Sequence, residues 1–91
     1  MKLLKTVDEK IADLGFVKMW ENEWGARYER QNARNYIQAV DICHKKSGKH
    51  MLFSYDKDRF GENCVGSVGV GLTYKEMRLF LQKMRQMHLQ S

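Results

Sequence analysis

The first residues of the chain have the spacing of an amphipathic helix. Apolar side chains recur every three or four positions, at Leu3, Leu4, Val7, Ile11 and Leu14. This spacing places them on one side of a helix with 3.6 residues per turn. Gly15 follows them and suits the left-handed residue that ends many helices. The pattern predicts a helix over about residues 2–14.

The pattern then changes to the two-residue period of β-strands. Residues 16–20 are rich in aromatic and β-branched side chains, and residues 24–29 alternate between large apolar and other side chains. Residues 36–44 predict a further strand. These segments indicate several antiparallel strands within about residues 16–72.

A hairpin is predicted after His44, because Gly48 fits the left-handed position of a short loop. The return strand covers about residues 49–55. The register that we expect places His44 opposite Lys49, Cys43 opposite His50, Ile42 opposite Met51, Val40 opposite Phe53 and Gln38 opposite Tyr55. It joins apolar side chains across one face of the pair, which stabilises antiparallel strands.

The end of the chain predicts a second helix. Residues 65–72 alternate between apolar and small side chains, which predicts a short fifth strand or an extended arm. Thr73 and Glu76 then have the spacing of a capping box, in which both side chains bind free amide groups at a helix start. A helix is predicted over about residues 74–88. Its apolar face is expected to consist of Met77, Phe80, Leu81, Met84 and Met87.

These elements predict an α+β fold. We expect a four- or five-stranded antiparallel sheet with the N-terminal and C-terminal helices packed on one face. The other face of such a sheet is free to meet water or a partner. At 91 residues the chain has room for one core, so a single domain over residues 1–91 is predicted.

Composition agrees with a folded domain inside a cell. Hydrophobic residues make up 43% of the chain and charged residues 30%, which is not the composition of a disordered protein. No apolar run approaches the roughly 18 residues of a membrane span, and the first residues lack a signal-peptide stretch. We therefore expect a cytoplasmic protein with no membrane contact. The two cysteines are predicted to be free thiols.

Positive charge gathers in the second half of the chain. The formal net charge is +5, with sixteen basic and eleven acidic residues. Residues 1–44 hold seven of each sign, whereas residues 45–91 hold nine bases and four acids. A one-sided excess attracts anionic partners, and charged surfaces also serve solubility alone.

Two short segments resemble small proteins that bacterial prophages carry, a group without an assigned activity. They are residues 54–58 (SYDKD) and residues 71–76 (GLTYKE). The resemblance covers part of the second half of the chain. It implies a bacterial or phage-infected cell and an accessory role.

Three features are candidates for binding. The first, here named the basic tip, comprises Lys45, Lys46, Lys49 and His50 at the predicted hairpin loop. The second is a basic rim on the last helix, where Lys75, Arg78 and Arg85 fall within one narrow sector. The third is the aromatic pair Trp20 and Trp24, which either belongs to the core, as most large side chains of a small domain do, or forms an exposed anchor.

Catalytic chemistry is not predicted. Cys43, His44, His50 and Cys64 are residue types that bind metals, but they lack the paired spacing of a zinc site. A cysteine–histidine nucleophile pair would also need an orienting group and an oxyanion site, and the sequence indicates neither. We therefore predict no enzyme activity, no catalytic residue, no metal and no cofactor.

The function predicted from the sequence is that of a small interaction module. It would bind an acidic surface of a host protein through the basic tip, the open sheet face and the rim of the last helix. The alternative is nucleic-acid binding, with the same basic residues contacting phosphates. The oligomeric state does not follow from the sequence.

Overall fold

Four antiparallel strands and two helices make up the fold, in the computed structural model that describes residues 4–34, 36–57 and 69–90, with side chains up to Met87. The elements in chain order are α1 (Val7–Asp13), β1 (Val17–Asn22), β2 (Gly25–Ala33), β3 (Tyr36–His44), β4 (His50–Asp56) and α2 (Tyr74–Gln90). Each strand pairs with the next, so the sheet order is β1-β2-β3-β4. The predicted α+β class, with one helix before and one after the sheet, is confirmed.

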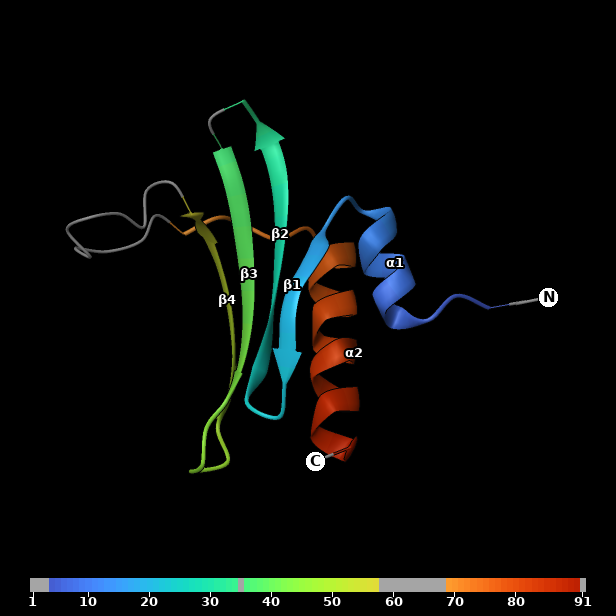
Figure 1. The fold of residues 1–91 in the computed structure, drawn as a ribbon, viewed down its shortest axis with the longest axis vertical. Helices are drawn as coiled ribbons and strands as arrows, with labels where there is room; N and C mark the ends of the chain where they lie inside the picture. The colour runs from blue at the N-terminus through green and yellow to red at the C-terminus, as the bar shows by residue number, and fades with distance from the viewer. Residues whose placement is uncertain (1–3, 35, 58–68, 91) are drawn as a thin grey trace.

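Both helices lie on the same side of the sheet, where α1 packs beside α2 and α2 also contacts β4 (Figure 1). The two-residue period of the strands therefore separates an inner face, toward the helices, from an outer face. Inner-face residues of β2 and β3 form the centre of the core: Ala26, Tyr28, Val40 and Ile42. Val7 and Ile11 of α1 and Phe80 of α2 belong to the same cluster.

The first helix is shorter than the predicted range of about 2–14. Thr6 is its N-cap, and its hydroxyl accepts a hydrogen bond from the Glu9 amide at 3.1 Å while the Glu9 carboxylate accepts one from the Thr6 amide at 2.9 Å. This capping box begins the helix about one turn later than the apolar spacing suggested. Leu4 is accordingly 84% exposed and is not part of the core.

A β-bulge in β1 decides which side chains face the helices. Lys18 pairs with Tyr28, but the next pairs are Trp20 with Arg27 and Glu21 with Ala26. Without the extra residue, Trp20 would lie on the same face as Lys18. The bulge instead moves Trp20 to the outer face and places Glu21 beside Lys18 on the inner face.

The predicted hairpin is present, but its register was wrong by one residue. His44 pairs with His50, Ile42 with Leu52, Val40 with Ser54 and Gln38 with Asp56. Cys43 therefore pairs with Met51 and not with His50. The reason is the loop, which closes with a hydrogen bond from the Lys45 amide to the Lys49 carbonyl. It therefore holds one more residue than expected between His44 and its partner, and the return strand begins one position later.

The second helix begins with the predicted capping box. The Thr73 amide donates to Glu76 Oε1 at 2.9 Å, and the Glu76 amide donates to the Thr73 hydroxyl at 3.1 Å. The predicted apolar face was wrong in part, since Met77 and Leu81 are 43% and 44% exposed. The buried residues of α2 are instead Glu76, Leu79, Phe80, Lys83 and Met87. Compared with the predicted apolar face, this buried face is rotated around the helix axis toward α1.

Where a fifth strand was predicted, the described residues form a single β-bridge next to β4. Gly69 bridges Tyr55, and the remaining described residues before α2 extend no strand. Residues 65–68 of the predicted strand lie outside the described residues, as does Cys64.

Candidate binding surface at one end of the sheet

The basic tip projects from the end of the sheet at which β3 turns into β4 (Figure 1). Gly48 has φ +89°, which only glycine adopts without strain, and its amide donates to the Lys45 carbonyl at 2.9 Å. Lys45, Lys46 and Lys49 are exposed. Within the described residues, none of the three ammonium groups has a carboxylate partner.

The turn between β1 and β2 lies at the same end and brings Trp24 against the tip. The Trp24 carbonyl accepts a hydrogen bond from the His44 amide at 2.8 Å, and the Trp24 amide donates to Asn22 Oδ1 at 2.8 Å. Gly25 permits this approach, because a Cβ there would lie 2.0 Å from the Ile42 carbonyl oxygen. The Trp24 side chain is nevertheless 49% exposed. An aromatic side chain and three lysines without a carboxylate partner in the described part of the chain thus share one end of the molecule.

Trp20 was grouped with Trp24 on sequence grounds, and the structure separates their surroundings. Trp20 lies within β1 on the outer face, opposite Arg27, and is 41% exposed. The interpretation of the two tryptophans as core is therefore wrong. Tyr28 and Tyr55 are the aromatic residues of the sheet that are buried.

His44 and His50 form the last pair of the β3–β4 ladder, next to the three tip lysines. His44 Nδ1 and His50 Nδ1 are 2.6 Å apart, and their rings meet edge to face with centroids 4.7 Å apart. At that distance one nitrogen donates a proton and the other accepts it. Cys43 is a half-buried free thiol, and burial raises its pKa. No cluster of three or more His, Cys, Asp or Glu side chains suited to a metal occurs in the described part of the chain.

The basic rim of α2 does not join the tip. Lys75 and Arg78 are on the first turns of α2, which lie away from the tip and near the middle of the strands in Figure 1. Together with Lys10 of α1 they line a groove of about 530 Å³ between the two helices, here named the helix groove. Arg85 is exposed farther along α2 and does not line this groove. The predicted binding residues therefore form separate surfaces.

The charges at the centre of the outer face are already satisfied. Arg27 donates to both carboxylate oxygens of Asp41, at 2.7 and 3.0 Å, and the Tyr55 hydroxyl donates to Asp41 at 2.8 Å. Burial and this hydrogen bond raise the pKa of Tyr55 to about 12. These groups stabilise the sheet and leave little free charge for a partner on this part of the face.

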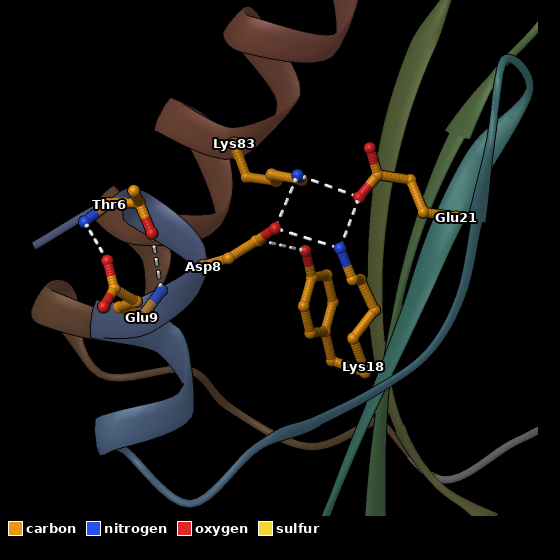
Figure 2. A network of polar contacts seen from close by, with 7 residues as sticks. Thr6, Asp8, Glu9, Lys18, Glu21 and Lys83 are labelled. Carbon is orange, nitrogen blue, oxygen red and sulfur yellow. Dashed lines mark hydrogen bonds and ion pairs between the residues drawn. The ribbon is translucent and has the colours of Figure 1, made fainter.

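A closed ring of ion pairs joins the two helices to β1, and the sequence did not reveal it (Figure 2). Lys83 lies 3.1 Å from Asp8 and 2.9 Å from Glu21, and Lys18 lies 3.0 Å from each of the same carboxylates. The Tyr28 hydroxyl also donates to Asp8 at 2.7 Å. The T-x-x-E spacing of residues 6–9 would have located the start of α1, but no local signal connects Asp8 with a lysine 75 positions later.

A second polar cluster lies under the start of α2. Arg30 donates to Glu76 at 2.7 Å, to Gln38 at 3.0 Å and to the Leu14 carbonyl at 3.1 Å, and its guanidinium carbon lies 4.2 Å from the centre of the Phe16 ring. Gln38 is 1% exposed and also donates to the Ser54 hydroxyl at 2.8 Å. These partners account for a buried charge and a buried amide within the core. Both clusters are therefore structural.

Comparison with known proteins adds no relative. No protein-family model, no curated protein and no solved structure matches the chain. Neither helix in the described residues is long and apolar enough to cross a membrane. The evidence for function is therefore the geometry of the surfaces described above.

Proposed function

We propose that this chain is a non-enzymatic interaction module that binds an acidic protein surface through Trp24 and the basic tip. One observation supports the proposal above the others. The backbone bond between His44 and Trp24 brings a residue with an exposed aromatic side chain next to the segment that carries three lysines, which have no carboxylate partner among the described residues. The chain holds these groups together at one end of its sheet.

The chemistry of these groups suits a protein partner. A tryptophan buried on binding supplies large apolar area and is enriched among the residues that dominate interface energies. Lysines around it attract an acidic surface and raise the association rate. Elsewhere on the sheet, charged groups such as Arg27 and Asp41 already bind one another. The tip therefore combines an exposed aromatic side chain with free positive charge, whereas the charges at the centre of the outer face are paired.

Nucleic-acid binding is the competing prediction from the same lysines. It would gain most from one continuous basic path along which a phosphate backbone lies. Lys75 and Arg78 instead line a groove between the helices, away from the tip. This separation favours a compact acidic protein surface over a nucleic-acid strand.

The test starts with affinity capture from a bacterial lysate, chosen because of the prophage resemblance, with and without nuclease. The captured partner is then titrated with the wild type and with the tip variant Lys45→Glu/Lys46→Glu/Lys49→Glu. We expect the tip variant to bind at least about tenfold more weakly, which corresponds to about 1.4 kcal/mol. Capture that disappears with nuclease, or equal affinity of the two forms, would overturn the proposal.

A matched control separates a local effect from a change in net charge. The helix-groove variant Lys10→Glu/Lys75→Glu/Arg78→Glu changes the net charge by the same amount on a surface away from the tip. It should bind the partner within about threefold of the wild type. Trp24→Ala should weaken binding more than Trp20→Ala, because the Trp24 backbone is bonded to His44 at the base of the tip, whereas Trp20 lies within β1.

A further inference from the structure

Strand β4 forms one edge of the sheet, and the chain itself already pairs with part of that edge. The Val70 amide donates to the Ser54 carbonyl at 3.0 Å, and Gly69 bridges Tyr55 in the antiparallel sense. After Val70 the chain turns away toward α2. The edge of β4 therefore accepts an added strand, and the pairing does not continue past Val70 in the described residues.

The next position along the same edge is Leu52. Alternate residues of a strand direct their amide and carbonyl groups to the same side. Since the Ser54 carbonyl points away from β3, the backbone groups of Leu52 point away from β3 as well. Among the described residues, no backbone hydrogen bond outside the strand ladder uses them.

An apolar groove, here named the edge groove, lies beside this open backbone. It has a volume of about 390 Å³, and Leu52, Leu72, Met77 and Leu81 are among the residues that line it. Met77 and Leu81 belong to the apolar stripe of α2 but remain 43% and 44% exposed, because the sheet does not cover them. If a strand were added at this edge, the side chains that it directs to the inner face would enter this groove.

The outer face of β4 is apolar as well, and the basic tip lies at the start of this strand. Met51 and Phe53 alternate with Leu52 and so point to the outer face, where Phe53 is 45% exposed. Lys49 comes directly before β4. An added strand would thus meet apolar surface on both of its faces and positive charge at one end.

We propose that β4 binds an extended segment of the acidic partner by strand addition. The segment carries apolar side chains at alternate positions and acidic residues at the end beside the basic tip. Main-chain hydrogen bonds to Leu52 supply affinity, and the edge groove selects the alternate side chains. This inference rests on the proposed function and adds the conformation and the sequence pattern of the partner.

The probe is a fluorescent synthetic peptide in which three glutamates follow four alternating valines and threonines, so that antiparallel pairing places the glutamates beside the basic tip. Binding to the wild type is compared with binding to Met77→Gln/Leu81→Gln, which removes the apolar lining of the groove without changing charge. The control is Val17→Gln/Met19→Gln, two exposed apolar residues on the opposite edge strand β1. We expect the groove variant to lose at least about tenfold in affinity and the control less than about threefold.

Hydrogen exchange supplies a second measurement that does not depend on a substitution. Bound peptide should slow exchange of the Leu52 amide, since that group becomes a donor to the added strand. A peptide of the same sequence with N-methylated valines should give no such protection. Unchanged exchange at Leu52, or no binding at millimolar peptide, would contradict the strand addition.

The outcomes separate this inference from the proposed function. Weaker binding by the tip variant together with unchanged binding by the groove variant overturns strand addition and leaves the acidic-surface proposal intact. Unchanged binding by the tip variant removes the tip from the site and contradicts the proposed function. A concentration-dependent dimer of the wild type, abolished in Met77→Gln/Leu81→Gln, would show that a second copy covers this edge and would also overturn the inference.

Discussion

Lysines serve opposite purposes in the helix-covered part of the molecule and at the basic tip. Lys83 is 9% exposed and contacts two carboxylates, Asp8 and Glu21, within a closed ring of ion pairs. Lys45, Lys46 and Lys49 are exposed and have no carboxylate partner in the described part of the chain. The same residue type is therefore structural in one region and available in the other.

The two regions also differ in how far their apolar side chains are buried. Under the helices Phe80 is fully buried and meets the rings of Phe16 and Tyr28 edge to face, with centroids 5.1 and 5.4 Å apart. Beside β4, Phe53 and Leu81 remain about half exposed. The comparison teaches that stability resides under the helices and that the free surface gathers around β4 and its loop.

The largest expected difference between the regions concerns two phenylalanines. Phe80→Ala should lower the free energy of unfolding by about 3–5 kcal/mol, because it deletes a fully buried ring. Phe53→Ala should lower it by less than about 1 kcal/mol, since that ring is already half in water. Chemical denaturation of both variants checks the comparison, and equal losses would show that the core extends to the outer face.

The next effect concerns two lysines. Lys83→Met keeps the length of the side chain and removes the ammonium that binds Asp8 and Glu21. We expect a loss of about 1.5–3 kcal/mol, the range for hydrogen bonds to charged groups. Lys46→Met should change stability by less than about 0.5 kcal/mol. Urea titrations would contradict the structural role of Lys83 if both variants were equally stable.

The cap of α2 should have a moderate effect. Thr73→Ala removes the hydroxyl that accepts the Glu76 amide, and such substitutions lower stability by about 0.5–2 kcal/mol. Exchange of the amides in the first turn of α2 should quicken before that of later turns. Thr73→Ser, which keeps the hydroxyl, is the control, and its exchange should resemble that of the wild type.

Acid should weaken the helix-covered region gradually. Burial alone would raise the pKa values of Asp8, Glu21 and Glu76, but hydrogen bonds from lysine, arginine, tyrosine and backbone groups outweigh it and leave all three below their ordinary values of 3.8 and 4.5. These carboxylates stabilise the fold above the ordinary values, and the stability is lost as the pH falls through the lowered ones. Thermal melts between neutral and strongly acidic pH measure this loss. Asp8→Asn should flatten the pH dependence.

The smallest effect on stability belongs to the tip. The tip variant should change the free energy of unfolding by less than about 1 kcal/mol, because its three side chains are exposed and unpaired. Raising the ionic strength should leave its stability almost unchanged. A loss comparable to that of Lys83→Met would mean that the tip lysines support the fold.

Local signals in the sequence predicted the elements well. The capping box of Thr73 and Glu76, the loop glycine Gly48 and the alternation of β3 each depend on residues a few positions apart. The hairpin register was wrong because Met51, Leu52 and Phe53 are all apolar. Either register of β4 therefore places apolar residues on the inner face of the sheet. Only the length of the loop decides between the two registers.

Non-local contacts account for what the sequence did not predict. The burial of Lys83 depends on Asp8 and on a bulge that moves Glu21 to the inner face, and neither has a signal near residue 83. The binding residues were predicted individually, but helix and strand periods do not tell which end of the molecule they reach. Trp24 thus joined the basic tip, while Lys75 and Arg78 joined Lys10 in a different groove.

The placement of α1 before the sheet and α2 after it has a consequence for synthesis. A ribosome releases α1 and all four strands before α2. Until Phe80 and Lys83 emerge, the inner face of the sheet stays open to water, and Asp8 and Glu21 have only Lys18 to neutralise them. The nascent chain therefore exposes its most aggregation-prone surface for the longest time, and it reaches its native state only when residues 74–87 have left the exit tunnel.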